Sequence, residues 1–208
     1  MTDHIIFFLN SSITLFSVLD PIGAVGVFLV LTANMSKERR QAQVGRTVKA
    51  VTIILLVFTF TGAAIFKVFG ISISALLVAG GLILMQMSLR MLEGKTTVSR
   101  NSAKEQDEAE IKDDIAIIPM AIPFLAGPGA ITTVIVFASR TEGVVGWVSL
   151  IISVSLVIGL TYIILLQSQR LAAMLGETGM RITVRVMGII LLAMGAEFTL
   201  SGIKGYFN

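Results

Sequence analysis

The sequence is poor in the residues on which most enzymes and metal proteins depend. It has no cysteine, which excludes disulfides and thiol chemistry, and its single histidine, His4, lies near the start of the chain. A histidine-rich metal site and a serine–histidine hydrolase are therefore excluded, and we predict a protein that is not an enzyme and uses no metal or cofactor. Charged residues make up only 14% of the 208 residues, against about 25% in soluble proteins.

Apolar residues take the place of the missing charges. Hydrophobic residues account for 55% of the chain, and the mean hydropathy is +0.90. Six segments are apolar on all sides and have about the twenty residues that a membrane-spanning helix needs. They are residues 5–33, 48–66, 71–92, 115–139, 144–167 and 182–203. We therefore predict an all-α membrane protein with six transmembrane helices.

The basic residues are distributed unevenly between the connections of these helices. If the N-terminus is outside, 13 of the 16 lysines and arginines fall in inside loops and helix ends, and only Lys67, Arg140 and Lys204 fall outside. Positive residues favour the cytoplasmic side of a membrane. We predict a multi-pass protein of the inner or plasma membrane with both termini outside. The sequence pI of about 9.4 is then a sign of topology, and we expect no nucleic-acid partner.

Two of the six segments carry helix breakers in matching places. The first contains Asp-Pro-Ile-Gly at 20–23, and the fourth contains Gly-Pro-Gly at 127–129. FSVLDPIGAVGVF parallels FLAGPGAITTVIV at a shift of 107, and GISISALLVAGGLILM parallels GMRITVRVMGIILLAM at a shift of 109. We predict that helices 1 and 4 are broken near these motifs. In the third and sixth helices, Gly80, Gly81 and Gly188 are expected to be helix-contact glycines.

The parallels indicate two related halves. Three helices are an odd number, so the second half must cross the membrane the other way up. We predict two inverted three-helix repeats, residues 1–92 and 115–208, joined by a polar cytoplasmic linker at 93–114. Inverted repeats with broken helices in equivalent places are typical of secondary transporters, whose binding site lies between the breaks. Chance similarity of two apolar sequences is the alternative.

The first break presents a carboxylate. Aspartate is favoured just before a helix and proline at its first position, so Asp20 and Pro21 predict the start of a half-helix inside the membrane. A carboxylate at that depth is costly and usually functional, although Asp20 can also serve as a helix cap alone. We expect Asp20 to meet the ammonium group of a substrate or a coupling proton. Glu197, in the last helix, is a second candidate for proton coupling.

The second break presents backbone N–H groups. Gly127 has no side chain with which to cap the half-helix, so free N–H groups and the positive end of the helix dipole form an anion site. Thr132 and Thr133 follow within about a turn, and an ordinary kink is the alternative. One break with a carboxylate and one with N–H groups suit a small zwitterion such as an amino acid. The predicted substrate-binding residues are Asp20, Pro21, Gly23, Gly127, Pro128, Gly129, Ala130, Thr132 and Thr133.

At these motifs the chain resembles the MarC family, which includes small neutral amino acid transporters. The matching pieces are DPIGAVGVF, FGISI with AGG, PMAIPFLAGPGAI, LGETG, and RVMGIILLAMG followed by FTLSGI, and they span nearly the whole chain. The resemblance implies a six-helix inner-membrane protein with inverted repeats that transports glycine, alanine or similar molecules, with protons as a candidate driving ion. One departure is Gly26, where the family often has a second proline.

The function predicted from these observations is secondary transport of small neutral amino acids. The alternatives are export of another small solute or a drug, and a channel-like membrane protein. The chain has no Walker A motif, so it does not have the phosphate-binding loop of an ATP-driven pump. The predicted partners are a small zwitterionic amino acid and the lipid bilayer. Whether the protein forms a homo-oligomer is left open.

Overall fold

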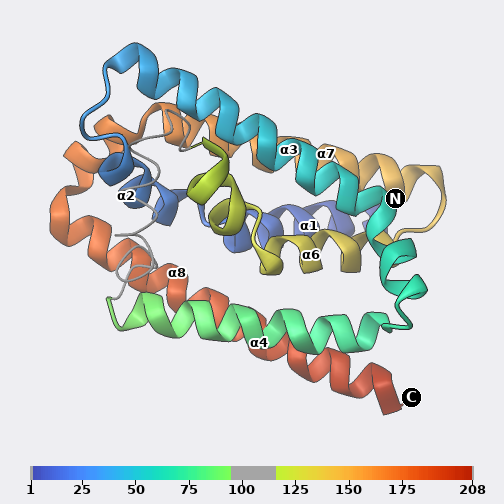
Figure 1. Ribbon diagram of the computed structural model, residues 1–208. Helices are drawn as coiled ribbons and strands as arrows, with labels where there is room; N and C mark the ends of the chain where they lie inside the picture. Colours follow the sequence, from blue (N-terminus) through green and yellow to red (C-terminus); the bar gives the residue numbers. More distant parts are fainter. Residues whose placement is uncertain (1, 95–115, 208) are drawn as a thin grey trace.

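The computed structural model describes residues 2–94 and 116–207, and every regular element in these ranges is helical (Figure 1). The elements of the first half are α1 (Thr2–Leu19), α2 (Pro21–Leu31), α3 (Lys37–Val68) and α4 (Ile73–Leu92). Those of the second half are the π-helix η2 (Ala116–Leu125), α6 (Pro128–Ser139), α7 (Gly143–Leu166) and α8 (Ser168–Phe207). The all-α prediction is confirmed. The predicted linker at 93–114 lies outside the described residues except for Glu93 and Gly94.

In the described ranges, five helices are long and apolar enough to cross a bilayer. They are His4–Leu31, Lys37–Val68, Ile73–Leu92, Gly143–Leu166 and Ser168–Phe207. The chain is therefore a multi-pass membrane protein. The predicted fourth span at 115–139 is instead divided between η2 and the shorter apolar helix α6.

The wide turns of η2 follow from its prolines. Pro119 and Pro123 supply no N–H group, so they weaken the ordinary pattern in which each N–H bonds the carbonyl four residues back. The helix closes with a bond from the Ala126 N–H to the Ala121 carbonyl, 2.8 Å long and five residues back. That spacing defines a π-turn, a form that occurs often at functional sites.

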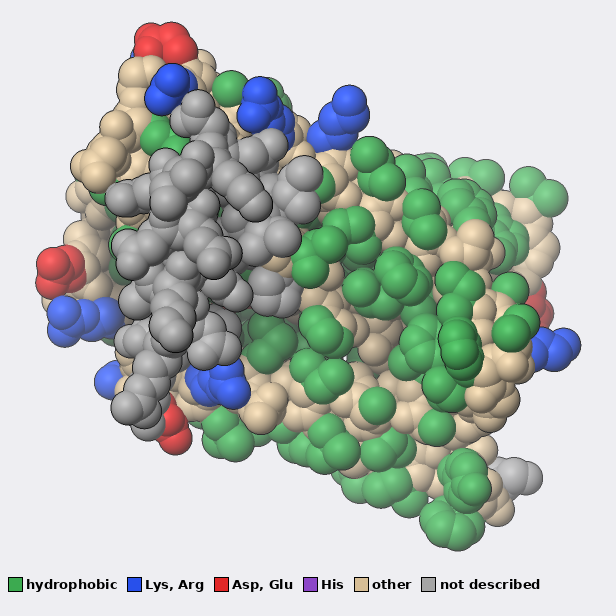
Figure 2. Space-filling model, viewed as in Figure 1, with side chains coloured by type: hydrophobic (Ala, Val, Ile, Leu, Met, Phe, Trp, Pro, Cys, Tyr) green, Lys and Arg blue, Asp and Glu red, His purple; other side chains and the backbone are tan. Residues whose placement is uncertain are grey.

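The charged residues gather at one end of the bundle. Figure 2 shows most of the visible lysines and arginines there, and a broad band of hydrophobic side chains toward the other end. We call this end, where α3 begins, α4 ends and α8 begins, the basic end; Lys37, Arg40, Arg90 and Arg170 belong to these parts of the helices. Both chain termini lie at the opposite end (Figure 1). The band of exposed apolar side chains is the surface that lipid would cover.

The broken segments lie at the centre of the bundle. In Figure 1, α1, α2, η2 and α6 run between the pair α3 and α7 on one side and the pair α4 and α8 on the other. Side chains of the central segments are almost completely buried, among them Leu15, Leu19, Phe28, Leu125 and Ile135. The two Pro-Gly breaks are therefore placed where protein, rather than lipid, surrounds them.

Helices α4 and α8 are antiparallel and pack with their backbones in close contact. A Cβ atom added to Gly195 would lie 2.7 Å from the Gly81 carbonyl oxygen, and one added to Gly202 would lie 2.6 Å from the Ser74 carbonyl oxygen. These contacts recur every seven residues along each helix, as in a coiled coil. We call them the glycine seam, formed by Ser74, Gly81 and Ser88 with Gly188, Gly195 and Gly202.

The helix-contact role predicted for three glycines is confirmed. Gly81 and Gly188 belong to the glycine seam, whereas Gly80 packs against the side chain of Thr132 on α6. Small residues allow such close approach in membranes, where van der Waals contact drives helix association.

Candidate functional site

The first break is centred on Asp20, between α1 and α2. Its backbone has φ 43° and ψ 60°, and it is the only non-glycine residue with positive φ in the described ranges. Aspartate tolerates this left-handed conformation better than most residues. Its carboxylate accepts a hydrogen bond of 3.1 Å from the Gly23 N–H, and Pro21 occupies the first position of α2. The predicted break in helix 1, with an aspartate cap, is confirmed.

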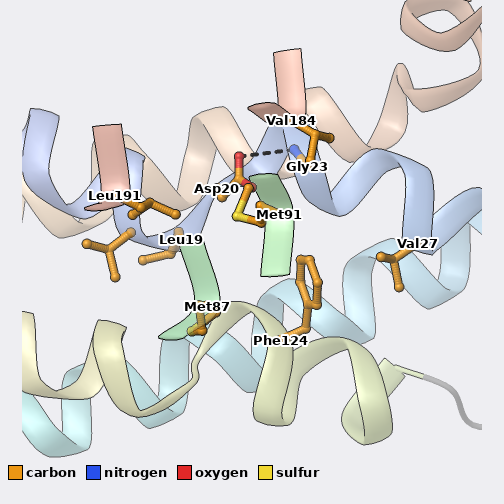
Figure 3. A pocket seen from close by; sticks show the side chains of 10 residues that line it. Leu19, Asp20, Gly23, Val27, Met87, Met91, Phe124, Val184 and Leu191 are labelled. Atoms are coloured by element: carbon orange, nitrogen blue, oxygen red, sulfur yellow. Dashed lines mark hydrogen bonds between the residues drawn. The ribbon is translucent and has the colours of Figure 1, made fainter. Parts of the chain in front are cut away.

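Asp20 lines a cavity whose other walls are apolar. Its side chain is 5% exposed, and Figure 3 shows the lining side chains converging from α1, α2, α4, η2 and α8. The cavity volume is about 30 Å³, counted as space open to the centre of a water molecule, which is enough for one or two waters. The lining residues are Val18, Leu19, Asp20, Gly23, Val27, Met87, Met91, Phe124, Val184 and Leu191.

The Asp20 carboxylate has unused hydrogen-bonding capacity. An ionised carboxylate can accept about four hydrogen bonds, and here only the Gly23 N–H donates one. Within residues 2–94 and 116–207, no lysine or arginine pairs with it. A buried charge without a partner costs several kcal/mol. The cavity is therefore suited to a guest that supplies an ammonium group or a proton, with the Phe124 ring available for a cation–π contact.

The cavity extends from Asp20 toward the basic end. Val27 lies two turns further along α2 in that direction, and Met91 lies near the end of α4 at the basic end. On the other side of Asp20 the helices are tightly packed. Ser11 on α1 bonds Ser153 on α7 at 2.8 Å, and the Phe7 and Phe137 rings meet edge to face at 5.7 Å.

The second break lies between η2 and α6. Gly127 caps α6 without a side-chain hydrogen bond, and Pro128 occupies its first position, so the predicted break in helix 4 is confirmed. A Cβ atom added to Gly129 would lie 2.6 Å from the Leu84 side chain and 3.4 Å from that of Val18. Val18 is two residues before Asp20, so the two breaks are neighbours in the bundle.

The other predicted site residues lie away from the cavity. Thr132 is buried against Gly80, and the Thr133 hydroxyl donates a 2.8 Å bond to the Gly129 carbonyl. Ala130 is buried, and neither it nor Gly127 lines the cavity. Glu197 is exposed on α8, where its carboxylate accepts a 3.4 Å bond from Ser201. The structure thus brings Asp20 and Gly23 to the cavity, and the roles of the others stay predictions.

The apolar wall of the cavity was not predicted from sequence. Met87 and Met91 are four residues apart, which places them on one face of α4. That spacing was the available signal, but nothing in it links this face to Asp20. Phe124, Val184 and Leu191 join the wall through the packing of η2 and α8 against α2 and α4, which only the structure reveals.

The chain is similar to a known group of proteins over nearly its whole length. Residues 5–207 match the model of the "MarC family integral membrane protein". A UPF0056 membrane protein of Pyrococcus abyssi is 35% identical, covering 93% of this chain and 92% of the relative. One of Methanocaldococcus jannaschii is 37% identical (96% and 97% covered), and YhcE of Escherichia coli is 31% identical (94% and 91% covered). No solved structure matches.

Proposed function

Because this chain belongs to the MarC family of integral membrane proteins, we propose that it is a secondary transporter of small neutral amino acids such as glycine and alanine. The proposal places it in the inner or plasma membrane, with the basic end in the cytoplasm and both termini outside. The uneven distribution of lysine and arginine supports this orientation.

The observation that carries the proposal is the buried Asp20 carboxylate in an otherwise apolar cavity. A purely structural helix cap would need only the Gly23 N–H, and a buried carboxylate with spare acceptor positions would be unfavourable. A primary ammonium group donates three hydrogen bonds and cancels the charge. In this proposal Asp20 binds the ammonium group of the solute and is also the group that takes up a coupling proton.

The fold is proposed to consist of two inverted three-helix repeats, with η2 and α6 together forming the fourth span. The pattern of helix contacts supports this arrangement: α2 packs on α8 as α6 packs on α4, and α1 packs on α7 as η2 packs on α3. These pairs are exchanged when each element is replaced by its equivalent in the other half. Such an exchange is expected if the halves are related by a two-fold axis.

In this proposal the repeat has one shift, 107 residues, in place of the two shifts of 107 and 109 taken from the sequence. Under this shift the contact of Gly81 with Gly195 becomes that of Gly188 with Ser88, which is also part of the glycine seam. The shift of 109 taken from the sequence would instead make Gly81 equivalent to Ile190, whose side chain is 40% exposed. The packing of α4 on α8 therefore favours 107, in agreement with the Pro21 and Pro128 pair.

The proposal predicts that removing the charge of Asp20 reduces transport. Asn caps a helix about as well as Asp and also tolerates left-handed backbone, so Asp20→Asn should insert and fold. A hydrogen bond to a charged group contributes about 1.5–3 kcal/mol, so the affinity for glycine should fall about tenfold to a hundredfold. Uptake and binding of labelled glycine in proteoliposomes measure this change.

Glu197→Gln provides the matched control, because it removes the same charge from an exposed position outside the cavity. This variant should take up glycine normally, and loss of uptake would make Glu197 the coupling group. Normal transport by Asp20→Asn would show that Asp20 serves only as a helix cap.

Competition assays test the class of solute. Glycine, alanine and serine should compete, whereas lysine, glutamate and tryptophan should not. Equal competition by methylamine or acetate would refute recognition of a zwitterion. If a bulky hydrophobic drug is carried and glycine is not, the drug-exporter alternative is favoured.

A further inference from the structure

The two breaks are equivalent in the proposed repeat, but the cavity described above lies beside the first of them. At the first break, Val27, Met87 and Leu191 line the Asp20 cavity. The residues 107 positions away are Val134, Met194 and Leu84, of which Val134 lies on α6 and Leu84 contacts Gly129 at the second break. There, Leu84 occupies the space beside Gly129, and Val134 is completely buried. The space that forms a cavity beside Asp20 is therefore occupied by side chains at the equivalent position beside the second break.

Between the second break and the end of the bundle that carries the termini, α6 is in close contact with its neighbouring helices. Thr132 on α6 packs against Gly80 on α4, and one turn further Ile135 packs against Gly62 on α3. The equivalent part of the lining of the Asp20 cavity is less tightly packed. Val184 there is partly exposed, whereas its equivalent Leu77 is only 5% exposed. At the equivalent pairs Val27 and Val134, Met87 and Met194, and Leu191 and Leu84, the side chains are similar in size, so the difference there is one of packing.

We propose that a second solute-binding cavity, the equivalent of the Asp20 cavity, opens beside the second break toward the end of the bundle that carries the termini. Its lining consists of Leu77, Leu84, Gly127, Ala130, Val134 and Phe198. It receives the same small zwitterion when the Asp20 cavity closes. The inference rests on the proposed inverted repeat.

The glycine seam is the natural pivot for exchanging one cavity for the other. It is the contact between equivalent helices, and the 107-residue shift exchanges two of its contacts, that of Gly81 with Gly195 and that of Ser88 with Gly188, so this part of the seam has the same form whichever cavity is open. Transporters built from inverted repeats expose their site to each side in turn by rocking one part against the other. If the Asp20 cavity closed, α2 would pack against α8 in the way that α6 now packs against α4.

Single cysteines test the second cavity directly, because the natural chain contains none. Val27→Cys and Val134→Cys are equivalent valines, one beside each break. Val136→Cys is the matched control, since Val136 is also a buried valine of α6 but has no equivalent in the lining of the Asp20 cavity. Each variant is placed in membrane vesicles of known orientation and treated from either side with a charged, membrane-impermeant methanethiosulfonate.

The expected result is labelling from opposite sides. Val27→Cys should react from the side of the basic end, and Val134→Cys from the side of the termini. A minor conformation is typically populated at about 0.1–10%, so Val134→Cys should react at about that fraction of the rate of a freely exposed cysteine. Val136→Cys should not react from either side. Ala130→Cys, at the position equivalent to Gly23, replaces Val134→Cys if that variant fails to insert.

Two results would overturn the inference. One is labelling of Val134→Cys from the same side as Val27→Cys. The other is a rate no higher than that of Val136→Cys in a variant that still takes up glycine. A different result separates the inference from the proposed substrate: if Val134→Cys reacts from the side of the termini but glycine is not carried, the second cavity exists and the amino-acid assignment is wrong.

Discussion

Replacing Gly195 by alanine should weaken the bundle measurably, because the glycine seam has no room for a side chain. A Cβ atom at this position would lie 2.7 Å from the Gly81 carbonyl oxygen and 2.9 Å from the Met85 backbone nitrogen. Both are backbone atoms, so the clash is relieved only if α4 and α8 move apart. Overpacking of this kind costs about 1–3 kcal/mol of unfolding free energy.

The matched control is Gly159→Ala in α7, where an added Cβ atom would have no heavy atom within 4 Å. Both substitutions gain the same helix propensity, up to about 1 kcal/mol, so the difference between the two variants isolates the packing cost. Combining Gly195→Ala with Gly81→Ala should cost less than the sum of the single changes. One separation of the helices accommodates both methyl groups, and neighbouring sites of this kind are not additive.

The assay is equilibrium unfolding in mixed detergent micelles. Trp147 is the only tryptophan, and its ring stacks on that of Phe60 at 5.7 Å between α7 and α3, so its fluorescence reports unfolding away from the seam. The reasoning is refuted if Gly195→Ala is as stable as Gly159→Ala. A double variant that loses the full sum of the single losses would show that the helices do not move together.

Three further outcomes are expected. Gly23→Ala should reduce glycine uptake as strongly as a change at Asp20 itself, because the new methyl group would overlap the Asp20 carboxylate; normal uptake would contradict the geometry of the first break. Arg40→Ala should lower stability by about 1–3 kcal/mol, since Arg40 donates bonds of 2.9 Å and 3.1 Å to the carbonyl and hydroxyl of Thr32 at the end of α2; unchanged thermal stability in detergent would argue against this cap. A cysteine replacing Lys104 should be labelled only from the cytoplasm, and labelling from outside alone would reverse the proposed topology.

Helix position and type followed from the sequence where hydropathy and turn chemistry agreed. The Asp-Pro and Gly-Pro pairs gave both breaks, because a cap residue before a proline at the first helical position is a local feature. Hydropathy gave shorter helices than the structure has. The second span was predicted at 48–66, but α3 begins at Lys37, since the basic turns before residue 48 continue the helix beyond the apolar stretch.

The π-helical form of η2 and the wall of the cavity could not be predicted from the sequence. Hydropathy measures how well a segment suits lipid and says nothing about whether its hydrogen bonds are those of an α-helix or a π-helix, so 115–139 was taken as a single broken helix. Asp20 could be singled out by its charge. Its neighbours Met87, Phe124 and Leu191 are ordinary apolar residues, and only the contacts among α2, α4, η2 and α8 bring them together.

The glycine seam also has a consequence for biosynthesis. Helix α4 leaves the ribosome about a hundred residues before α8, yet its glycine face has no lasting partner until α8 is inserted. Val184 and Leu191, which complete the wall of the Asp20 cavity, arrive with the same helix. Assembly is therefore completed only by the final span. A chain cut short before Gly176 would keep its earlier spans but leave the small-residue face of α4 without the helix that covers it.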